Sequence, residues 1–203
     1  MIWLFFILTT SQLFGQSKYP ADSLISSSNI SIFQKTALIP IMTWQRLSYN
    51  SNLFNCQFHP SCSNYGAVAI EQHGVIIGGI MTSDRIVRCN PFAFNYHLGS
   101  SERFHNSQGR LIDPVLPTLR FKKPKKSPLI ASMFSALIPG SGRIYAGRTM
   151  DGLMGMTTVY QFATIAYFAK KENYVSADYL FSAVTLLVYA GEIYGSWRSA
   201  KYY

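Results

Sequence analysis

Two long apolar blocks in the C-terminal half limit the folds that this chain can adopt. Residues 152–169 contain no charged residue, and residues 179–197 are interrupted only by Glu192. A helix that crosses a bilayer needs about 20 mostly apolar residues. Tyrosine and tryptophan gather at the ends of both blocks, and these side chains favour the headgroup level of a membrane. The two blocks therefore predict a transmembrane helical hairpin.

A shorter apolar segment, residues 127–145, precedes this hairpin. It contains Pro139 and two glycines, which favour a re-entrant or interfacial helix, with a third membrane span as the alternative. The stretch ALIPGSGRIYAGRTMDGL at 136–153 is similar to the glycine-rich turn of TM2-like bacterial membrane proteins with two spans. We therefore treat residues 127–203 as one membrane region.

The composition supports contact with an anionic surface. Charged residues make up 13% of the chain, against about 25% in an average soluble domain. Eighteen Lys and Arg against nine Asp and Glu give a net charge of +9, which favours nucleic acid or anionic lipid as a partner. The basic run RFKKPKK at 120–126 has little aromatic interleaving and belongs to no nucleic-acid-binding motif. We expect anionic lipids and no nucleic acid.

The N-terminus raises a question of topology. Residues 1–16 include an apolar run that is too short to span a bilayer and that resembles a secretory signal, although the usual preceding positive charges are missing. The alternative is an uncleaved segment that dips into the membrane. The arginines and lysine that flank the predicted hairpin favour cytoplasmic ends, whereas a cleaved signal would export the chain. The two topologies both stay open at this point.

The segment between the N-terminus and the membrane region predicts a small helical module, residues 32–118. A polar linker at 17–31 precedes it and a basic linker at 119–126 follows it. Apolar spacing predicts a helical face at 32–48, in which Pro40 either kinks the helix or starts a new one. A second helix is capped by Ser61 or Ser63 and stops at Gly74, a third covers 75–88, and 93–118 is an irregular loop. The expected fold class is all-α.

Three cysteines, Cys56, Cys62 and Cys89, are the candidates for chemistry in this module. A zinc site that uses His59 or His73 as further ligands, a disulfide, a reactive thiol and thiols buried in a turn all fit their residue types. The spacing CxxHxxC departs from the usual zinc spacings, and no base with an orienting partner is recognisable. The sequence therefore predicts no catalytic residue, no metal and no cofactor.

Four stretches in this module together carry a family resemblance. They are WQRLS (44–48), NCQFHPSCSNYGAVAIEQHG (55–74), GIMTSDRIVRCNPF (79–92) and DPV (113–115). Residues 36–117 resemble the membrane protein insertion efficiency factor family, YidD. The matching residues, which we expect to be structural, include Cys56, Phe58, Pro60, Cys62, Ser63, Tyr65, His73, Gly74, Cys89 and Pro91. The chain departs from the family pattern at Trp44, at Asn90 and in a longer loop before Asp113.

The resemblance implies a non-enzymatic role in assisting the insertion and folding of integral proteins of the bacterial inner membrane. It implies the YidC insertase, the Sec translocon and nascent membrane proteins as partners, and a basic module on the cytoplasmic face. The basic residues that we expect to contact the membrane or a partner are Lys35, Arg46, Arg85, Arg88, Lys122, Lys123, Lys125 and Lys126. The alternative is an exported membrane protein that reuses the module as a structural or interaction unit.

Overall fold

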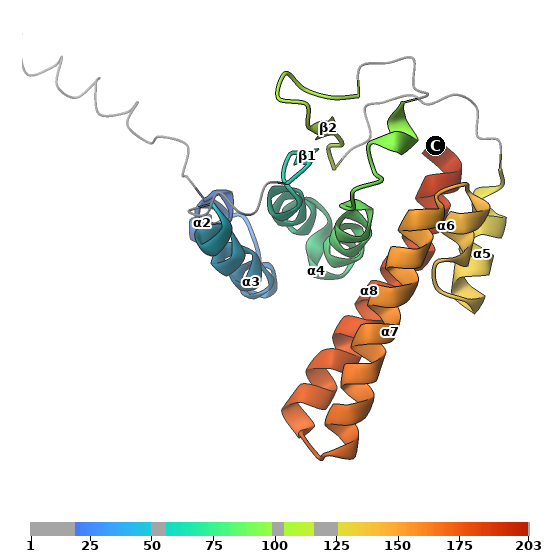
Figure 1. Cartoon of the computed structure of the whole chain (residues 1–203). Coiled ribbons are helices and arrows are strands. Elements are labelled where there is room, and N and C mark those ends of the chain that lie inside the picture. The colour runs from blue at the N-terminus through green and yellow to red at the C-terminus, as the bar shows by residue number, and fades with distance from the viewer. Residues whose placement is uncertain (1–18, 50–55, 99–103, 116–125, 203) are drawn as a thin grey trace, which may run out of the picture.

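The computed structural model describes residues 19–49, 56–98, 104–115 and 126–202. The protein is mostly helical, as the sequence predicts (Figure 1). The N-terminal helices are α2 (Pro20–Ser26), α3 (Ile32–Ser48), α4 (Cys62–Arg88) and the short 3-10 helix η2 (Asn95–His97). The C-terminal helices are α5 (Pro128–Leu137), α6 (Ser141–Tyr145), α7 (Thr149–Lys171) and α8 (Val175–Tyr202).

A short parallel pair of strands departs from the predicted all-α class. Strand β1 (Phe58–His59) pairs with β2 (Leu111–Ile112), and Phe58 lies opposite Leu111. Strand β2 and helix η2 lie within residues 93–118, for which the sequence predicts an irregular loop. Two-residue strands give too short an alternation to be recognised from sequence. Their pairing brings the chain after η2 back against the start of α4.

Helix α3 begins with a capping box. The Ser31 side chain accepts a hydrogen bond from the Gln34 backbone at 3.3 Å, and the Gln34 side chain accepts one from the Ser31 backbone at 2.9 Å. Gln34 Nε2 also donates to the carbonyl oxygen of Ile70 at 2.8 Å. This bond joins α3 to α4 beside a core that contains Leu38 and Ile70. Pro40 lies inside α3, as the sequence predicts.

Helix α4 bends sharply at Gly74, which has φ 78° and ψ 177°. Only glycine adopts such a φ readily, so the predicted break between two helices at this residue is confirmed. Ser61 caps the first half by accepting a hydrogen bond from the Asn64 backbone at 3.3 Å. After the bend, the second half returns against the first. A Cβ added at Gly78 would lie 2.6 Å from the carbonyl oxygen of Ala69.

The predicted linker at residues 17–31 contains helix α2, which corrects that expectation. Proline stands in its first turn, where the missing N–H is not needed for helical hydrogen bonds. Ala21 is buried, and its N–H donates to Gln45 Oε1 at 3.1 Å. A contact with a residue of α3 thus orders a stretch whose composition alone is polar.

Helices α7 and α8 cover the two apolar blocks and pack along each other as a hairpin that projects beyond α3 and α4 (Figure 1). Within the described ranges, no helix is both long enough and apolar enough to cross a bilayer. The predicted transmembrane spans are therefore not supported. Glycine, threonine and tyrosine interrupt the aliphatic residues of both helices, which lowers their hydropathy although their length is adequate.

Residues 127–145 do not form one continuous helix, so the predicted alternative of a third span at this segment is also corrected. The segment folds as α5 and α6, and the chain turns between them at Gly140, whose φ is 84°. Two further predictions lie outside the described residues: the signal-like segment at 1–16, and the part of the basic run that contains Lys122, Lys123 and Lys125.

Candidate functional site

The three cysteines meet in space. Cys56 precedes β1, Cys62 is the first residue of α4, and Cys89 follows its last residue. Cys56 Sγ lies 3.5 Å from Cys62 Sγ and 4.0 Å from Cys89 Sγ. All three thiols are free and half-buried, and their sulfur atoms lie within 4.8 Å of one another. The bend at Gly74 makes this possible, because it brings the two ends of α4 together.

Backbone and side-chain N–H groups point at this sulfur cluster. The Cys62 backbone donates to Cys56 Sγ at 3.4 Å, and Gln57 Nε2 donates to Cys89 Sγ at 3.9 Å. Hydrogen bonds from Cys62 and then from Cys89 lower the pKa of the Cys56 thiol far below its ordinary value. The hydrogen bond to Cys56, with burial, raises the pKa of Cys62. The hydrogen bonds among the thiols therefore favour a thiolate at Cys56 rather than at Cys62 or Cys89.

The histidines considered as zinc ligands lie elsewhere. His59 is exposed on β1, and His73 borders an apolar groove at the bend of α4. Across the part of the chain that the structure covers, the three sulfur atoms are the metal-ligating atoms that gather within ligand distance of one another. The predicted ligand sets that combine cysteine with these histidines do not assemble.

Arg85 and Arg88 are buried, which corrects the expectation that they contact lipid. Both guanidinium groups bind the carboxylate of Asp113. Arg85 Nη2 also donates to the carbonyl oxygen of Pro60 at 3.0 Å, and its guanidinium lies 3.8 Å from the ring centroid of Phe58. A guanidinium enclosed in this way is not available to a membrane surface. These arginines instead hold the cysteine-bearing loop.

The buried charges continue into the C-terminal helices. Asp84 accepts hydrogen bonds from Arg88 at 3.0 Å, from Arg143 at 2.8 Å and from Arg198 at 3.3 Å. Arg198 also donates to Asp113 at 2.6 Å. Buried ions persist only when they are paired. We call Asp84, Arg85, Arg88, Asp113, Arg143, Glu192 and Arg198 the ion network.

The charges of the ion network favour the ionised form of its two aspartates. Burial raises the pKa of Asp84, but the charges of Arg88, Arg143 and Arg198 outweigh burial and lower this pKa to about 2. For Asp113, burial is likewise outweighed by arginine charge, so its pKa lies well below its usual range. Asp84 and Asp113 are therefore ionised at neutral pH, and the network bonds α4 to α6 and α8.

Asp84 and Glu192 are not among the residues that the sequence predicts for a site, and Asp113 is named there only as part of the family stretch DPV (113–115). A signal existed for Glu192, because a single acid inside an apolar block needs a cationic partner, and Arg143 Nε meets it at 3.0 Å. Asn90, where the chain departs from the family pattern, donates to Asp151 Oδ1 at 2.6 Å. That departure therefore contributes a contact between the end of α4 and α7.

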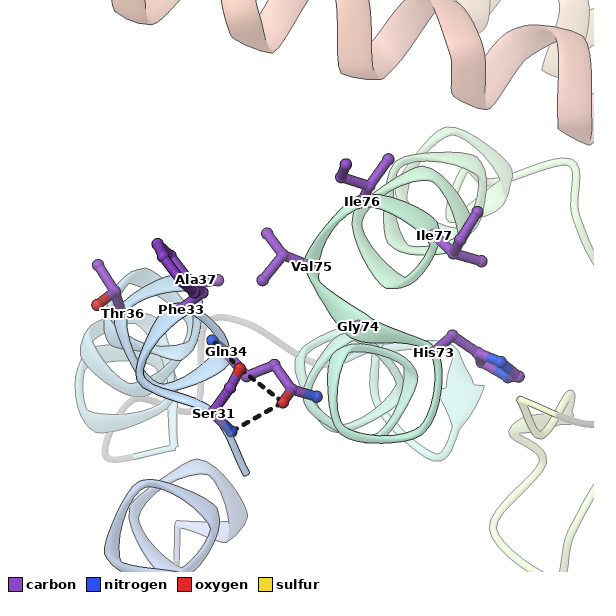
Figure 2. Close-up of a pocket in the computed structure, with 10 residues that line it drawn as sticks. All are labelled: Ser31, Phe33, Gln34, Thr36, Ala37, His73, Gly74, Val75, Ile76 and Ile77. Atoms are coloured by element: carbon purple, nitrogen blue, oxygen red, sulfur yellow. Dashed lines mark hydrogen bonds between the residues drawn. The ribbon is translucent and has the colours of Figure 1, made fainter. Parts of the chain in front are cut away.

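An apolar groove of about 890 Å³ lies between α3 and the bend of α4 (Figure 2). Phe33 is 78% exposed, Ile76 70% and Ile77 52%. The lining consists of Ser31, Phe33, Gln34, Thr36, Ala37, His73, Gly74, Val75, Ile76 and Ile77. Figure 2 shows Phe33, Ala37 and Val75 on the two sides of the space between the helices. The groove offers apolar side chains from both helices to a ligand.

The end of the α7–α8 hairpin carries a second exposed apolar surface. We call it the hairpin tip, and its exposed large side chains are Tyr167, Phe168, Tyr174, Val175, Tyr179 and Leu180. Lys170 and Lys171 stand among them and are also exposed. Aromatic rings beside lysines match the interface between lipid headgroups and water.

The other residues that the sequence predicts for the site differ in their burial. Tyr65 is buried with its ring 4.9 Å from the Arg85 guanidinium, Ser63 lies 3.3 Å from the Tyr49 hydroxyl, and Pro91 is exposed after the thiol cluster. Lys35 is half-exposed. Two cations reach the surface with partners: Arg46 pairs with Asp22 at 3.1 Å, and Lys126 lies 4.8 Å from the ring centroid of Tyr145.

Comparison with known proteins points to one family. A family profile described as "Putative membrane protein insertion efficiency factor", YidD, matches residues 33–97. A relative of that name from Azoarcus sp. strain BH72 is 41% identical over 59 residues, which cover 29% of this chain and 86% of the relative. Another, from Oleidesulfovibrio alaskensis, is 47% identical over 60 residues, covering 29% and 67%. No solved structure matches the chain.

Proposed function

This chain belongs to the membrane protein insertion efficiency factor family, and we propose that it is a membrane-associated accessory factor that assists the insertion and folding of integral proteins of the bacterial inner membrane. The description of the family names membrane protein insertion and no enzymatic reaction. The observation that carries the proposal is the apolar groove between α3 and α4, because most of its lining falls inside the matched residues 33–97.

The groove is suited to an apolar helix of a protein that is being inserted. Phe33, Ile76 and Ile77 expose more than half of their surface, and each gains roughly 25 cal/mol for every Å² of apolar surface that a ligand covers. Polar groups of Ser31 and Gln34 are occupied by the capping box. The groove therefore presents apolar side chains from both helices, and the polar groups of Ser31 and Gln34 already have hydrogen-bond partners.

In this proposal, the hairpin tip and the basic run at 120–126 contact the membrane. Lys170 and Lys171 are exposed at the tip, and each lysine near an anionic leaflet contributes about 1 kcal/mol. The aromatic side chains of the tip would lie at headgroup level. The basic run that ends at Lys126 would add further attraction. Contact with the YidC insertase and the Sec translocon at the cytoplasmic face belongs to the same proposal.

The test is complementation of a strain that lacks this protein, with the insertion of a defined two-span inner-membrane protein as the readout. Protease protection of that client measures insertion. We expect the wild type to restore insertion and the double variant Ile76→Ser, Ile77→Ser to lose the added efficiency. Ile86→Ser is the matched control, because Ile86 is a 57% exposed isoleucine of the same helix that does not line the groove.

If the double variant restores insertion of the client to the level of the wild type, the groove is not required for the insertion role. Equal loss in the double variant and in Ile86→Ser would show that the effect is not specific to the groove. Both variants replace exposed side chains, so unfolding is not expected, and circular dichroism of the purified proteins checks this.

A further inference from the structure

We propose that Cys56, Cys62 and Cys89 form a binding site for a thiophilic metal ion such as Zn²⁺, with the fourth ligand position open to water or to an external donor. The spacing of the cysteines along the chain speaks against such a site, but their arrangement in space favours it. The proposal does not depend on the insertion role.

The sulfur separations fit a metal site. Zinc binds thiolate sulfur at about 2.3 Å in a tetrahedron, which places neighbouring sulfur atoms about 3.8 Å apart. In the protein, Cys56 Sγ lies 3.5 Å from Cys62 Sγ and 4.0 Å from Cys89 Sγ, and all three atoms lie within 4.8 Å of one another. An ion can therefore bind all three with only small side-chain movements.

The three cysteines are held in place by contacts that do not involve a metal. Arg85 Nη2 donates to the carbonyl oxygen of Pro60, within the loop between Cys56 and Cys62. The Leu111 backbone donates to the carbonyl oxygen of Gln57 at 2.8 Å, and Gln57 Nε2 donates to that of Asn90 at 2.6 Å. The loop is thus fixed to the strand pair and to the end of α4, so little conformational freedom is lost when an ion binds.

Hydrogen-bond donors face two of the three sulfur atoms. Metal ligation requires deprotonated cysteine, and hydrogen bonds to ligand atoms orient them. The Cys62 backbone N–H and Gln57 Nε2 donate to Cys56 Sγ and Cys89 Sγ. Two alternatives to a metal site explain the arrangement less well. A disulfide would use two of the thiols and leave the third without a role. Simple packing of the cysteines on Phe58 and Leu111 would not require the three sulfur atoms to face one another.

The site resembles catalytic and transport zinc sites in its ligand number more than closed structural sites. Structural zinc is held by four protein ligands, whereas three protein ligands leave one position free. The three cysteines are half-buried, so water or a small external donor can reach the fourth position. Among the described residues, no fourth cysteine, histidine or carboxylate joins the group.

The experiment uses the full chain, purified under reducing and oxygen-free conditions. Titration with Co²⁺ reports thiolate ligation through charge-transfer absorption and a tetrahedral site through intense visible bands, and competition with Zn²⁺ gives relative affinity. We expect one equivalent of metal per chain. Zn²⁺ should protect all three thiols from alkylation, as measured by mass spectrometry. Each of Cys56→Ser, Cys62→Ser and Cys89→Ser should weaken binding more than about tenfold, since even outer-shell changes cost about that much.

His59→Ala and His73→Ala are the matched controls, and both should bind metal as the wild type does. Absence of stoichiometric Co²⁺ and Zn²⁺ binding by the reduced wild type overturns the site without relying on any variant that might misfold. Binding that survives all three cysteine substitutions does the same. Loss of binding in His59→Ala overturns the three-thiol assignment, and a pair of thiols that stays oxidised and excludes metal indicates a disulfide instead.

Discussion

At the scale of single residues, the buried charges dominate the energetics. Asp113 meets Arg85, Arg88 and Arg198, and Asp84 meets Arg143 as well as Arg88 and Arg198. Removing one partner of a buried ion pair leaves the other charged group unpaired, which typically costs 3–5 kcal/mol. The two aspartates are therefore the side chains whose loss should harm the fold most.

Asp113→Asn should lower the free energy of unfolding by about 3–5 kcal/mol, because three buried arginines lose a shared carboxylate. Urea denaturation followed by circular dichroism measures this change. Asp22→Asn is the control, since its pair with Arg46 is largely exposed, and exposed pairs contribute up to about 1 kcal/mol. Similar losses in the two variants would contradict the importance of the ion network.

A second prediction concerns His97 and acid. Burial lowers the pKa of His97 to about 4 from its ordinary value of 6.5, so the unfolded chain takes up a proton at higher pH than the folded one. Stability contributed by neutral His97 is therefore present above pH 6.5 and is lost as pH falls toward about 4. The pKa of Glu192 is raised by burial, and this group acts in the opposite sense.

Thermal unfolding between pH 4 and pH 7 measures the effect. Replacing His97 with Gln isolates it, because every other group keeps its titration. We expect the melting temperature of the wild type to fall more steeply on acidification than that of His97→Gln. Parallel curves for the two proteins would show that His97 does not contribute to the acid sensitivity.

At the scale of elements, the bend of α4 organises the molecule. It lets the halves of the helix pack together, places Cys62 beside Cys89 and forms one wall of the groove. The close approach is made at Gly78, where an added Cβ would lie 2.6 Å from the backbone of Ala69 and Ile70. At Gly79, an added Cβ would meet the end of the Leu187 side chain at 3.0 Å.

These adjacent glycines give a matched pair of variants. Gly78→Ala should destabilise the protein by about 1–3 kcal/mol or more, because backbone atoms cannot yield and the halves must separate. Gly79→Ala should be close to neutral, since the Leu187 side chain can move and alanine favours a helix by about 1 kcal/mol over glycine. Chemical denaturation of both variants distinguishes the cases. A larger loss in Gly79→Ala would contradict this account of the bend.

At the scale of the whole molecule, the family match ends at residue 97, yet the ion network extends beyond it. Arg143, Glu192 and Arg198 come from α6 and α8, outside the matched residues. Asp84 is fully buried by their presence. The C-terminal helices therefore complete the electrostatic environment of α4 in this chain.

A chain that ends at residue 126 should lose protection in the second half of α4. Such a chain keeps Arg88 beside Asp84 but lacks Arg143 and Arg198, and it exposes the face of α4 that packs on α8. Hydrogen–deuterium exchange should be faster in residues 78–88 of the shortened chain than in the full one, with α3 as the internal reference. Unchanged exchange in residues 78–88 would show that α4 does not depend on the C-terminal helices.

The sequence by itself determined the local structure and the family. Helical spacing, Ser61 as a cap and Gly74 as a break predicted the helices around the bend, since these depend on neighbours within one or two turns. Four short stretches predicted the insertion-factor family, which the comparisons show. The composition indicated an anionic partner, which stays a prediction.

Only the tertiary structure decided which charges are buried and which thiols meet. From the sequence, Arg85 and Arg88 look like surface cations. In the fold they meet Asp113, which lies 28 and 25 residues further along the chain. Arg198, 85 residues beyond Asp113, binds the same aspartate. The apolar blocks predict membrane spans, but no helix of the described residues is both long enough and apolar enough to cross a bilayer, and α7 and α8 pack on each other and on α4. The spacing of apolar residues predicts which side of a helix is apolar, but the segments that cover that side come from distant parts of the chain.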